Sequence, residues 1–375
     1  MCFAEKVDVM NKLNVLHLIS SLEAGGAERL LLDQIEENIN NKIDYTVVVM
    51  NNKINEVIKS RLLSLTPNVY FLNRKSGNKS PKYLFKLSKI IKKHNVRIIH
   101  FHNLGSKFWS MFCKFLNPSL KLVYTLHTVD LIDSLTWIEY FLHKYFIDIN
   151  IAVSKTIEAE CHTNKIYNVK QVYNGIKLDK FSQVAQEPFE KLKIINVARM
   201  EHEIKGQDIL IKALKICKDK GLVFDCKLVG ENESLYTRAS DKYIKELIKN
   251  FGLEQEIKIL GTRHDIPSLL RQSNLFILPS RQEGFGLVVI EAMAARVLTI
   301  SSNIDGPSEL IEHGKTGFLF ETENPEDLAQ KIVYVHKNMH NLTKIRQNAS
   351  EFVKNFDIKF MSKNILKIYE NLTEI

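Results

Sequence analysis

The chain of 375 residues is 45% hydrophobic and 25% charged, which excludes a disordered or fibrous protein and, at this length, favours two domains. It contains no run of about 18 uncharged apolar residues and no compact apolar core near its N-terminus, so neither a membrane-spanning helix nor a signal peptide is expected. The formal net charge is +9, and the five cysteines show no Cys-x-x-Cys spacing. We therefore expect small buried thiols in a cytoplasmic protein rather than disulfides or a zinc ribbon.

The first half of the chain alternates short apolar runs with amphipathic segments. One amphipathic segment spans residues 83–94, where Leu84, Leu87 and Ile91 lie on one helical face. Strands are predicted at residues 14–19, 45–50, 68–72, 97–102, 120–126 and 150–153. Alternation of this kind predicts a parallel sheet with right-handed crossovers.

The net positive charge lies in this first half. Residues 1–185 account for all of the +9, and no acidic residue occurs between Glu56 and Asp130, where there are fourteen Lys or Arg. A field of one sign favours an anionic partner, either membrane phospholipid or nucleic acid. A solvated basic face without a partner is the alternative.

The alternating pattern restarts in the second half, with a helix predicted at 207–218 and strands at 191–198, 224–229, 256–260, 275–279, 297–301 and 316–320. We therefore predict an α/β fold of two Rossmann-like β/α/β domains that face each other across a cleft. The predicted N-terminal domain spans residues 1–182 and the C-terminal domain 183–355. Residues 356–375 are predicted to form a helix that packs back toward the N-terminal domain.

The strongest motif runs from Leu278 to Ala294, from a strand end into a helix. Gly284 and Gly286 leave backbone N–H groups bare at a helix N-terminus, where an anion is favoured. Glu283 precedes this turn and suits sugar hydroxyls, whereas Glu291, about two turns further on, suits a ribose diol. Two residues of the same turn complete the predicted binding segment: Phe285 and Leu287.

Two cations are predicted beside this motif. Arg199 follows the strand at 191–198, and Lys205 comes just before the next helix. Positive charge at the ends of parallel strands can neutralise a departing diphosphate. Because the chain contains no Asp-x-Asp motif, we expect neither a catalytic metal nor a cofactor.

With these motifs the chain resembles glycosyltransferase family 4, a retaining group of GT-B architecture. Further matches to the family are Val197–Arg199, Lys205-Gly206, Leu228–Gly230, Leu260-Gly261, Gly306–Glu309 and Thr316-Gly317. The resemblance implies that Arg199 and Lys205 hold the donor diphosphate, that Glu283 contacts the donor sugar, and that Glu291 binds the ribose. Residues 295–297 and 305–308 depart from the usual family pattern, and the latter leave the identity of the sugar open.

Two features of the first half match the family as well. The Gly25-Gly26 loop after the first strand corresponds to a loop that borders the donor phosphate and the acceptor, although an ordinary tight turn is the alternative. His127, at the end of the strand at 120–126, corresponds to a histidine near the reacting centre. Its alternative is a structural histidine.

Three other polar positions have less specific interpretations. His100 and His102 share one face of a strand, but no third ligand is spaced near them, so we interpret them as strand-end residues with His102 on the acceptor side. Ser154 either lies near the acceptor or caps the following helix.

We therefore predict a retaining glycosyltransferase of the hexosyltransferase class. It would move a hexose or N-acetylhexosamine from a nucleotide-diphosphate sugar, preferentially a UDP-sugar, to a hydroxyl of a saccharide or lipid-linked acceptor in cell-surface polysaccharide or glycolipid synthesis. The first domain would bind the acceptor and the second the donor. The alternatives are a sugar-nucleotide epimerase or hydrolase of the same fold, or a basic non-enzymatic protein that binds nucleic acid or membrane.

A basic and aromatic helix over residues 107–115 could contact an anionic membrane. The alternative is that its aromatic face is simply core. With the first interpretation, the protein would be cytoplasmic and peripheral at the inner face of the plasma membrane. We expect no nucleic-acid partner, because neither a helix-turn-helix nor an aromatic ribbon is evident and the second half has no net charge.

Overall fold

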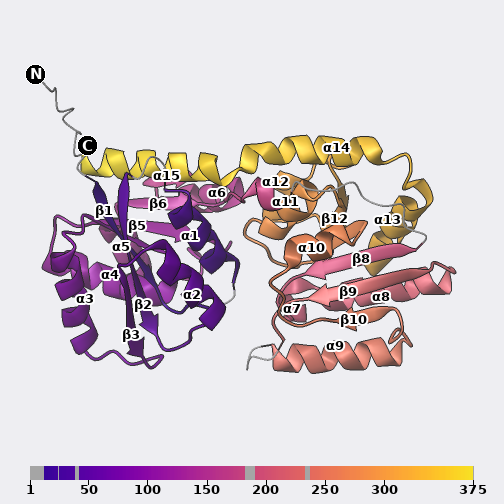
Figure 1. The fold of residues 1–375 in the computed structure, drawn as a ribbon, viewed down its shortest axis with the longest axis horizontal. Helices are drawn as coiled ribbons and strands as arrows, with labels where there is room; N and C mark the ends of the chain where they lie inside the picture. The colour runs from indigo at the N-terminus through magenta and orange to yellow at the C-terminus, as the bar shows by residue number, and fades with distance from the viewer. Residues whose placement is uncertain (1–11, 24, 39–41, 182–190, 233–236, 375) are drawn as a thin grey trace, which may run out of the picture. The chain divides into compact units, whose positions relative to one another are not determined.

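The computed structural model describes residues 12–23, 25–38, 42–181, 191–232 and 237–374 (Figure 1). The N-terminal segment with Cys2, Ala24 of the glycine loop, and residues 182–190 at the predicted domain junction lie outside the described residues. Within the described part, no helix combines the length and the apolar character needed to cross a membrane.

The chain forms two compact units. Unit 1 comprises Met1–Val153, Glu158–Val172 and Ile358–Ile375, and unit 2 comprises Ser154–Ile157 and Tyr173–Asp357. The predicted domain boundary lies between residues 182 and 183, whereas the compact units change between Val172 and Tyr173. Each unit contains one parallel sheet.

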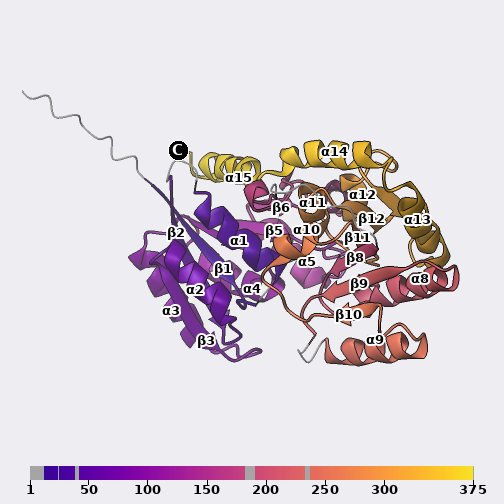
Figure 2. The same ribbon diagram turned by 45° about the vertical axis from the view of Figure 1, so that its right-hand side comes forward.

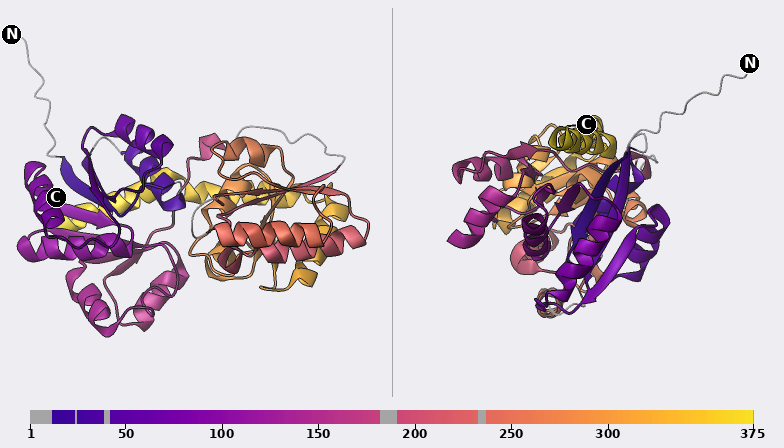
Figure 3. Two further views of the ribbon diagram at one scale, coloured as in Figure 1. Left: turned by 90° about the horizontal axis from the view of Figure 1, so that it is seen from below. Right: turned by 90° about the vertical axis from the view of Figure 1, so that its left-hand side faces the viewer.

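Unit 1 is built on a seven-stranded sheet with the order β3-β2-β1-β4-β5-β6-β7. The strands are β1 (Leu13–Ile19), β2 (Ile43–Asn51), β3 (Val69–Arg74), β4 (Ile98–Phe101), β5 (Lys121–Leu126), β6 (Ile149–Ala152) and β7 (Val169–Gln171). The helices are α1 (Gly26–Glu36), α2 (Glu56–Leu65), α3 (Lys82–Lys93), α4 (Leu104–Leu116), α5 (Trp137–Phe146), most of α6 (Lys155–Thr163) and α15 (Ile358–Thr373). Helices lie on both sides of this sheet (Figure 3).

One core of unit 1 joins α1, α2 and α15 to the sheet. Buried aliphatic residues of β1 and β2 pack with Leu31 and Leu32 of α1 and with Ile365 and Tyr369 of α15. Figures 1 and 2 show α15, in yellow, beside α1 and the N-terminal strands. The last helix of the chain is therefore part of the first unit.

Unit 2 is built on a six-stranded sheet with the order β10-β9-β8-β11-β12-β13. The strands are β8 (Leu192–Val197), β9 (Phe224–Val229), β10 (Ile257–Ile259), β11 (Leu275–Leu278), β12 (Leu298–Ser302) and β13 (Phe318–Phe320). The helices are α7 (His202–Lys205), α8 (Gln207–Asp219), α9 (Arg238–Asn250), α10 (Ile266–Arg271), α11 (Leu287–Ala294), α12 (Asp305–Leu310), α13 (Pro325–Asn338) and α14 (Thr343–Phe352). Two short 3₁₀ turns complete it: Leu178–Lys180 and Val353–Phe356.

The core of unit 2 lies between this sheet and its helices. Ile209, Leu210 and Leu214 of α8 pack with Ile332 of α13 against the apolar strands. All four described cysteines are buried and free, and they are Cys113, Cys161, Cys217 and Cys226. Burial raises the pKa of the Cys113 thiol to about 12, so the thiol stays protonated and acts as a small hydrophobic group.

The prediction of an α/β fold with two Rossmann-like domains is confirmed. In each sheet the strand order reverses once, next to β1 and β4 in unit 1 and next to β8 and β11 in unit 2. Ligands of open parallel sheets bind outside the carboxyl ends of the strands at such a switch point. The loops after these four strands are therefore where a site is expected in each unit.

Candidate functional site

In unit 2 the loops after β8 and β11 come together. The two strands are parallel neighbours, with Ile194 opposite Leu275 and Ile195 opposite Phe276, so their carboxyl ends lie at one edge of the sheet. The first loop carries Arg199 and leads through α7 to Lys205, and the second carries the glutamate-glycine motif. The sheet register thus places the two predicted cations and Glu283 in the same region of the unit.

Lys205 and Glu283 form the centre of this region. The Lys205 Nζ atom donates to Glu283 Oε2 over 2.9 Å, and the two side chains are 15% and 20% exposed. The pair is 78 residues apart in sequence and is shielded enough to hold one geometry, yet it remains accessible to solvent. A cation beside a carboxylate offers one partner for a phosphate and one for a hydroxyl.

Gly206 lets the chain place Lys205 there. The residue has a φ of +66° and begins α8, and a Cβ atom at this position would lie 1.9 Å from the carbonyl oxygen of Pro279. The backbone N–H of Arg281 donates to the carbonyl of Ile204, which fastens the two loops to each other. The Lys205-Gly206 step is thus a close approach of backbones that another residue would block.

Arg281 is a structural residue of this site that the sequence analysis does not identify. Its guanidinium donates to the buried Asp208 carboxylate and to the carbonyl of His202, and it also pairs with Glu323. Burial by itself would raise the pKa of Asp208, but hydrogen bonds from Arg281 and Lys212 leave that pKa below its usual value. The ion pair ties α7 and α8 to the loop after β11.

Arg199 occupies a different environment from Lys205. Its side chain is 58% exposed, and its Nη2 atom lies 3.2 Å from Glu201 Oε2. The carbonyl of Arg199 accepts a hydrogen bond from the Gln207 side chain, which holds the backbone after β8 in place. The structure therefore pairs Lys205 with Glu283 and pairs Arg199 with its neighbour in the same loop.

The glycine turn leads into α11 as the sequence predicts. Gly286 is the N-cap residue of α11 and has a φ of +95°. Gly284 and Phe285 are packed so closely against α12 that a Cβ atom on Gly306 would lie 2.6 Å from the Phe285 backbone. The Phe285 ring is buried against Tyr173 and Phe356. Its side chain therefore serves packing, and its backbone is the part available for the predicted binding role.

The two other residues that the sequence predicts to bind a donor lie in α11. Leu287 is the first residue of α11, and Glu291 is half-buried in the second turn of the same helix. Within residues 305–308, Gly306 has no side chain to obstruct the glycine turn before α11.

In unit 1 the glycine loop follows β1 and begins α1. Gly25 is the N-cap of the helix, and Gly26 is its exposed first residue. Nearby, the Ser20 hydroxyl donates to the Asn103 side chain, which also caps α4. The loops after β1 and β4 thus meet at the switch point of the first sheet.

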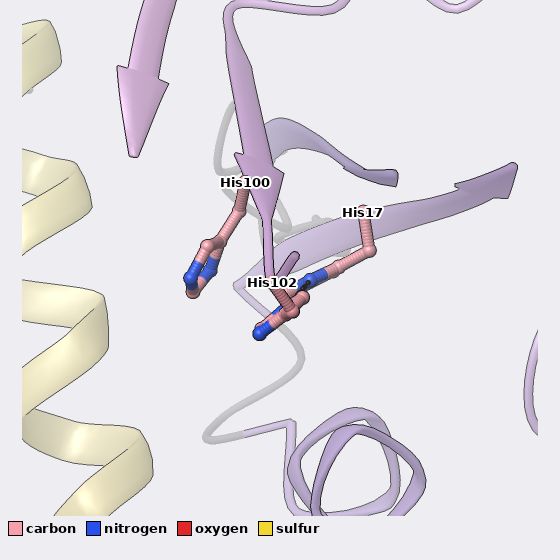
Figure 4. A group of neighbouring side chains, drawn as sticks. All are labelled: His17, His100 and His102. Atoms are coloured by element: carbon pink, nitrogen blue, oxygen red, sulfur yellow. Dashed lines mark hydrogen bonds between the residues drawn. The ribbon is translucent and has the colours of Figure 1, made fainter. Parts of the chain in front are cut away.

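A cluster of four histidines, His17, His100, His102 and His127, lies on β1 and at the ends of β4 and β5, and Figure 4 shows the first three. His17 of β1 is directly opposite His100 of β4 in the parallel register, and His102 and His127 follow the ends of β4 and β5. Ring nitrogens of His17, His100 and His102 lie within 4.8 Å of one another. Sequence spacing groups only His100 and His102, whereas His17 joins them from the neighbouring strand β1.

Burial keeps these histidines neutral. It lowers the pKa of His17 to about 3 and that of His127 to about 4. The pKa values of His100 and His102 also lie well below 6.5, first through burial and then through the neighbouring imidazoles. At neutral pH all four are uncharged hydrogen-bonding groups.

Ser154 follows the interpretation as a helix cap, since its hydroxyl accepts from the backbone N–H of Ile157. Glu309, which the sequence analysis notes as part of a family motif, has a defined partner set within unit 2. Its carboxylate accepts hydrogen bonds from the backbone N–H groups of Lys155 and Thr156 and from the Tyr173 hydroxyl.

The helix expected at residues 107–115 is α4, and its residues divide between core and surface. Lys107 and Trp109 are buried. Burial lowers the pKa of the Lys107 ammonium to about 8. The exposed aromatic residues of this helix are Phe108, Phe112 and Phe115. The surface interpretation of this helix is thus wrong for Lys107 and Trp109, and the core interpretation is wrong for the exposed rings.

Family comparisons agree with the motifs. A model described as Glycosyltransferase Family 4 matches residues 24–180, and one described as Glycosyl transferases group 1 matches residues 179–352. An uncharacterised glycosyltransferase of Methanocaldococcus jannaschii is 29% identical over 60% of each chain, so the match spans less than two thirds of that relative.

Two other relatives match over most of their length. The N-acetyl-alpha-D-glucosaminyl L-malate synthase of Bacillus anthracis is 28% identical over 83% of this chain and 85% of that protein. The UDP-Gal:alpha-D-GlcNAc-diphosphoundecaprenol alpha-1,3-galactosyltransferase of Escherichia coli is 23% identical over 87% and 88%.

The fold is shared with solved structures of glycosyltransferases. A glycosyltransferase from Rickettsia africae matches with a TM-score of 0.82 and 25% identity over 97% of this chain and 99% of that one. Anabaena HepE in complex with UDP-glucose matches with a TM-score of 0.83 and 23% identity, over 96% of this chain and 100% of that one. The chain therefore belongs to glycosyltransferase family 4 and is a glycosyltransferase of the GT-B fold.

Proposed function

We propose that the chain transfers a hexose or N-acetylhexosamine from a nucleotide-diphosphate sugar to a hydroxyl acceptor with retention of anomeric configuration. Unit 2 would bind the donor, and the observation that carries this assignment is the Lys205–Glu283 pair beside the glycine turn of α11. A bound donor would replace this internal pair with two intermolecular ones. Lys205 would then hold the diphosphate, and Glu283 would accept hydrogen bonds from sugar hydroxyls.

The proposed step is a front-face substitution. The acceptor oxygen forms a bond to the anomeric carbon while the bond from that carbon to the phosphate oxygen breaks, and its electron pair leaves with the nucleoside diphosphate. The acceptor proton passes to a phosphate oxygen. Lys205, Arg199 and the backbone N–H groups near Gly284 and Gly286 would stabilise the charge on the leaving diphosphate, and Glu291 would hold the ribose. His127 of unit 1 would form a hydrogen bond with a hydroxyl of the sugar substrate. No cofactor or metal takes part in this proposal.

The test of this proposal is transfer by a Glu283→Ala variant, with product configuration read by NMR. We expect at least a hundredfold loss of kcat/KM with unchanged thermal stability, because the hydrogen bonds to the sugar strengthen in the transition state. Glu312→Ala, at an exposed glutamate paired with Lys315, is the matched control. Wild-type turnover by Glu283→Ala, an inverted product, or loss of activity in EDTA would each contradict the proposal. Rapid donor turnover without acceptor would indicate an epimerase or hydrolase instead.

The proposed donor is a UDP-sugar and the proposed acceptor is a saccharide or lipid-linked saccharide. Structures of Anabaena HepE with UDP and with UDP-glucose, and the diphosphoundecaprenol acceptor in the name of the Escherichia coli relative, support this choice. The pathway would then be the synthesis of cell-surface polysaccharide or glycolipid.

We also propose that unit 1 binds an anionic membrane, where a lipid-linked acceptor would be found. On α5, Trp137 is 79% exposed, and Phe141 and Tyr145 follow it at intervals of four residues on the same helical face. Exposed aromatic residues of α4 lie next to basic residues of the α3 region, since Lys79 Nζ lies 5.9 Å from the Phe108 ring centroid. The exposed lysines on α3 are Lys82, Lys86, Lys89, Lys92 and Lys93.

This combination of aromatic and cationic groups suits a lipid surface, because rings insert at the headgroup level while lysines attract anionic lipids. The protein would then be cytoplasmic and peripheral at the inner face of the plasma membrane.

Cosedimentation with vesicles of phosphatidylcholine and phosphatidylserine tests the membrane proposal. Wild-type protein should bind, and salt should weaken the binding. A Trp137→Ala/Phe141→Ala variant should bind roughly tenfold more weakly, whereas Tyr167→Ala, which removes an exposed ring elsewhere in unit 1, should bind like wild type. If neither salt nor the α5 substitutions weaken the binding to vesicles, this surface does not bind the membrane.

A further inference from the structure

The histidine cluster of unit 1 contains a continuous hydrogen-bonded chain of imidazoles. His17 Nδ1 lies 3.0 Å from His102 Nε2, and His102 Nδ1 lies 3.4 Å from His127 Nε2. The ring planes of His17 and His102 differ by 14° and those of His102 and His127 by 28°. Figure 4 shows the rings of His17 and His102 close together, with His100 toward α15. The chain thus runs from the buried middle of β1 to the end of β5.

The neutral state of the three rings restricts their protons. Each imidazole carries one proton, and each of the two contacts needs one donor and one acceptor. Both contacts can therefore form only if the same nitrogen, either Nδ1 or Nε2, carries the proton in all three rings. In one arrangement every Nδ1 carries the proton, and His127 presents an Nδ1–H donor. In the other every Nε2 carries it, and His127 presents an Nδ1 lone pair.

The inner end of the chain decides between the two arrangements. His17 Nε2 is buried and has no hydrogen-bond partner among the described residues. If it carried the proton, an N–H group would be buried without an acceptor, which is rarer in proteins than an unmatched acceptor. The arrangement with protons on Nδ1 leaves only a lone pair unmatched at this end.

We propose that His17 and His102 are positioning residues that hold His127 in its Nδ1–H tautomer, so that His127 acts as a neutral hydrogen-bond donor toward the sugar substrate rather than as a base. The role toward the sugar rests on the proposed function, whereas the tautomer follows from the resting structure of unit 1. A neutral donor of this kind binds a hydroxyl or phosphate oxygen and takes no proton from the acceptor. This is consistent with a leaving phosphate that removes the acceptor proton.

The same nitrogens argue against a bound metal in place of the hydrogen bonds. Three neutral imidazoles within reach of one another are suitable zinc ligands. However, the two His100 nitrogens already contact the hydroxyl groups of Tyr369 and Thr125, and His17 and His102 use their facing nitrogens on each other. These ring nitrogens therefore already have hydrogen-bond partners in the protein and do not need a metal ion as a partner.

Imidazole NMR of the full chain tests the tautomer directly, without substrate. In long-range proton–nitrogen spectra at pH 7.5, His127 should show a protonated Nδ1 and an unprotonated Nε2, with its signals assigned by their loss in His127→Asn. His17→Leu removes the inner donor and should give a mixture of the two His127 tautomers. His17→Asn places an amide N–H near the former Nδ1 and should restore the single form. A wild-type His127 protonated on Nε2, or on both nitrogens, would overturn the inference even if neither His17 variant folds.

Activity provides the second readout. His17→Leu should lower kcat/KM roughly tenfold, about the effect of one lost hydrogen bond, and His17→Asn should recover most of it. In a His127→Ala background, His17→Leu should have no further effect. An equal loss in that background would mean that His17 is merely structural.

Two further outcomes are separable. If no donor supports transfer, the proposed function fails while the NMR result still decides the tautomer. Titration with Zn²⁺ alone should show no stoichiometric binding, and binding that His100→Ala abolishes would overturn the inference.

Discussion

At the scale of single residues, the part of the proposed donor site that a local motif marks can be predicted from the sequence. Lys205 and Glu283 were expected together because each follows a strand in a parallel sheet, and the structure joins them by an ion pair. Arg281 was not predicted. Its partner Asp208 is 73 residues away, and nothing in the local pattern of either residue indicates a pairing. His17 was not predicted as part of the histidine cluster either. It lies opposite His100 because β1 and β4 are neighbours in the sheet, which the spacing of residues in the sequence does not show.

The buried histidines make stability depend on pH. The pKa of His17 is about 3 in the folded chain and near 6.5 when unfolded, so the unfolded state binds the extra proton as pH falls below 6.5. The stability contributed by neutral burial is therefore complete above pH 7 and is lost progressively toward pH 3. At pH 5 this loss is about 2 kcal/mol for His17.

Urea unfolding between pH 7.5 and pH 5 measures this loss. Wild type should lose more unfolding free energy over that range than His17→Asn, by about 2 kcal/mol. The two curves should run parallel above pH 7. Equal losses in both proteins would mean that His17 is charged, or accessible to protons, in the folded state.

At the scale of elements, most strands lay close to their predicted positions, because buried parallel strands are continuous apolar runs. The predicted strand at 97–102 is β4, Ile98–Phe101, and the one at 120–126 is β5, Lys121–Leu126. The strand β7 was missed, since Val169–Gln171 has only three residues and shows no periodicity. Exposed aromatic residues on α5 were also missed, because a helical face of apolar residues usually signals core.

The turn between α7 and α8 supplies an element-scale prediction. Gly206→Ala should destabilise unit 2 by at least about 3 kcal/mol, because it adds a left-handed penalty of about 1–2 kcal/mol to a collision with the Pro279 carbonyl. It should also displace Lys205 and reduce donor binding. Gly252→Ala is the matched control, since its φ of +62° is similar and nothing lies within 4 Å of the added Cβ.

Unfolding free energies of the two variants, from urea titrations, compare these costs. Gly252→Ala should lose only about 1–2 kcal/mol and retain donor affinity. If both variants lose the same unfolding free energy, the close approach between Gly206 and the Pro279 carbonyl does not constrain this position.

At the scale of the whole molecule, the two Rossmann-like units could be predicted because the alternation of strands and helices occurs twice along the chain. Helix α15 belongs to unit 1 because it packs there. The Tyr369 side chain is fully buried, and its hydroxyl forms a hydrogen bond with His100 of β4. Most of the positive charge also belongs to unit 1, since residues 1–185 carry the whole formal excess of +9. A basic, aromatic first unit and a nearly neutral second unit with the proposed diphosphate site are consistent with different substrates for each.

The central claim is that Lys205 in unit 2 holds the diphosphate of a nucleotide-sugar donor. Thermal unfolding with a panel of nucleoside diphosphates, using wild type, Lys205→Ala and the surface control Lys215→Ala, tests it most directly. UDP at about 100 times its Kd should stabilise wild type and Lys215→Ala by about 2.7 kcal/mol, which raises the Tm. It should leave Lys205→Ala nearly unchanged. An equal rise in Tm for all three proteins, or no rise with any nucleotide, would contradict the account.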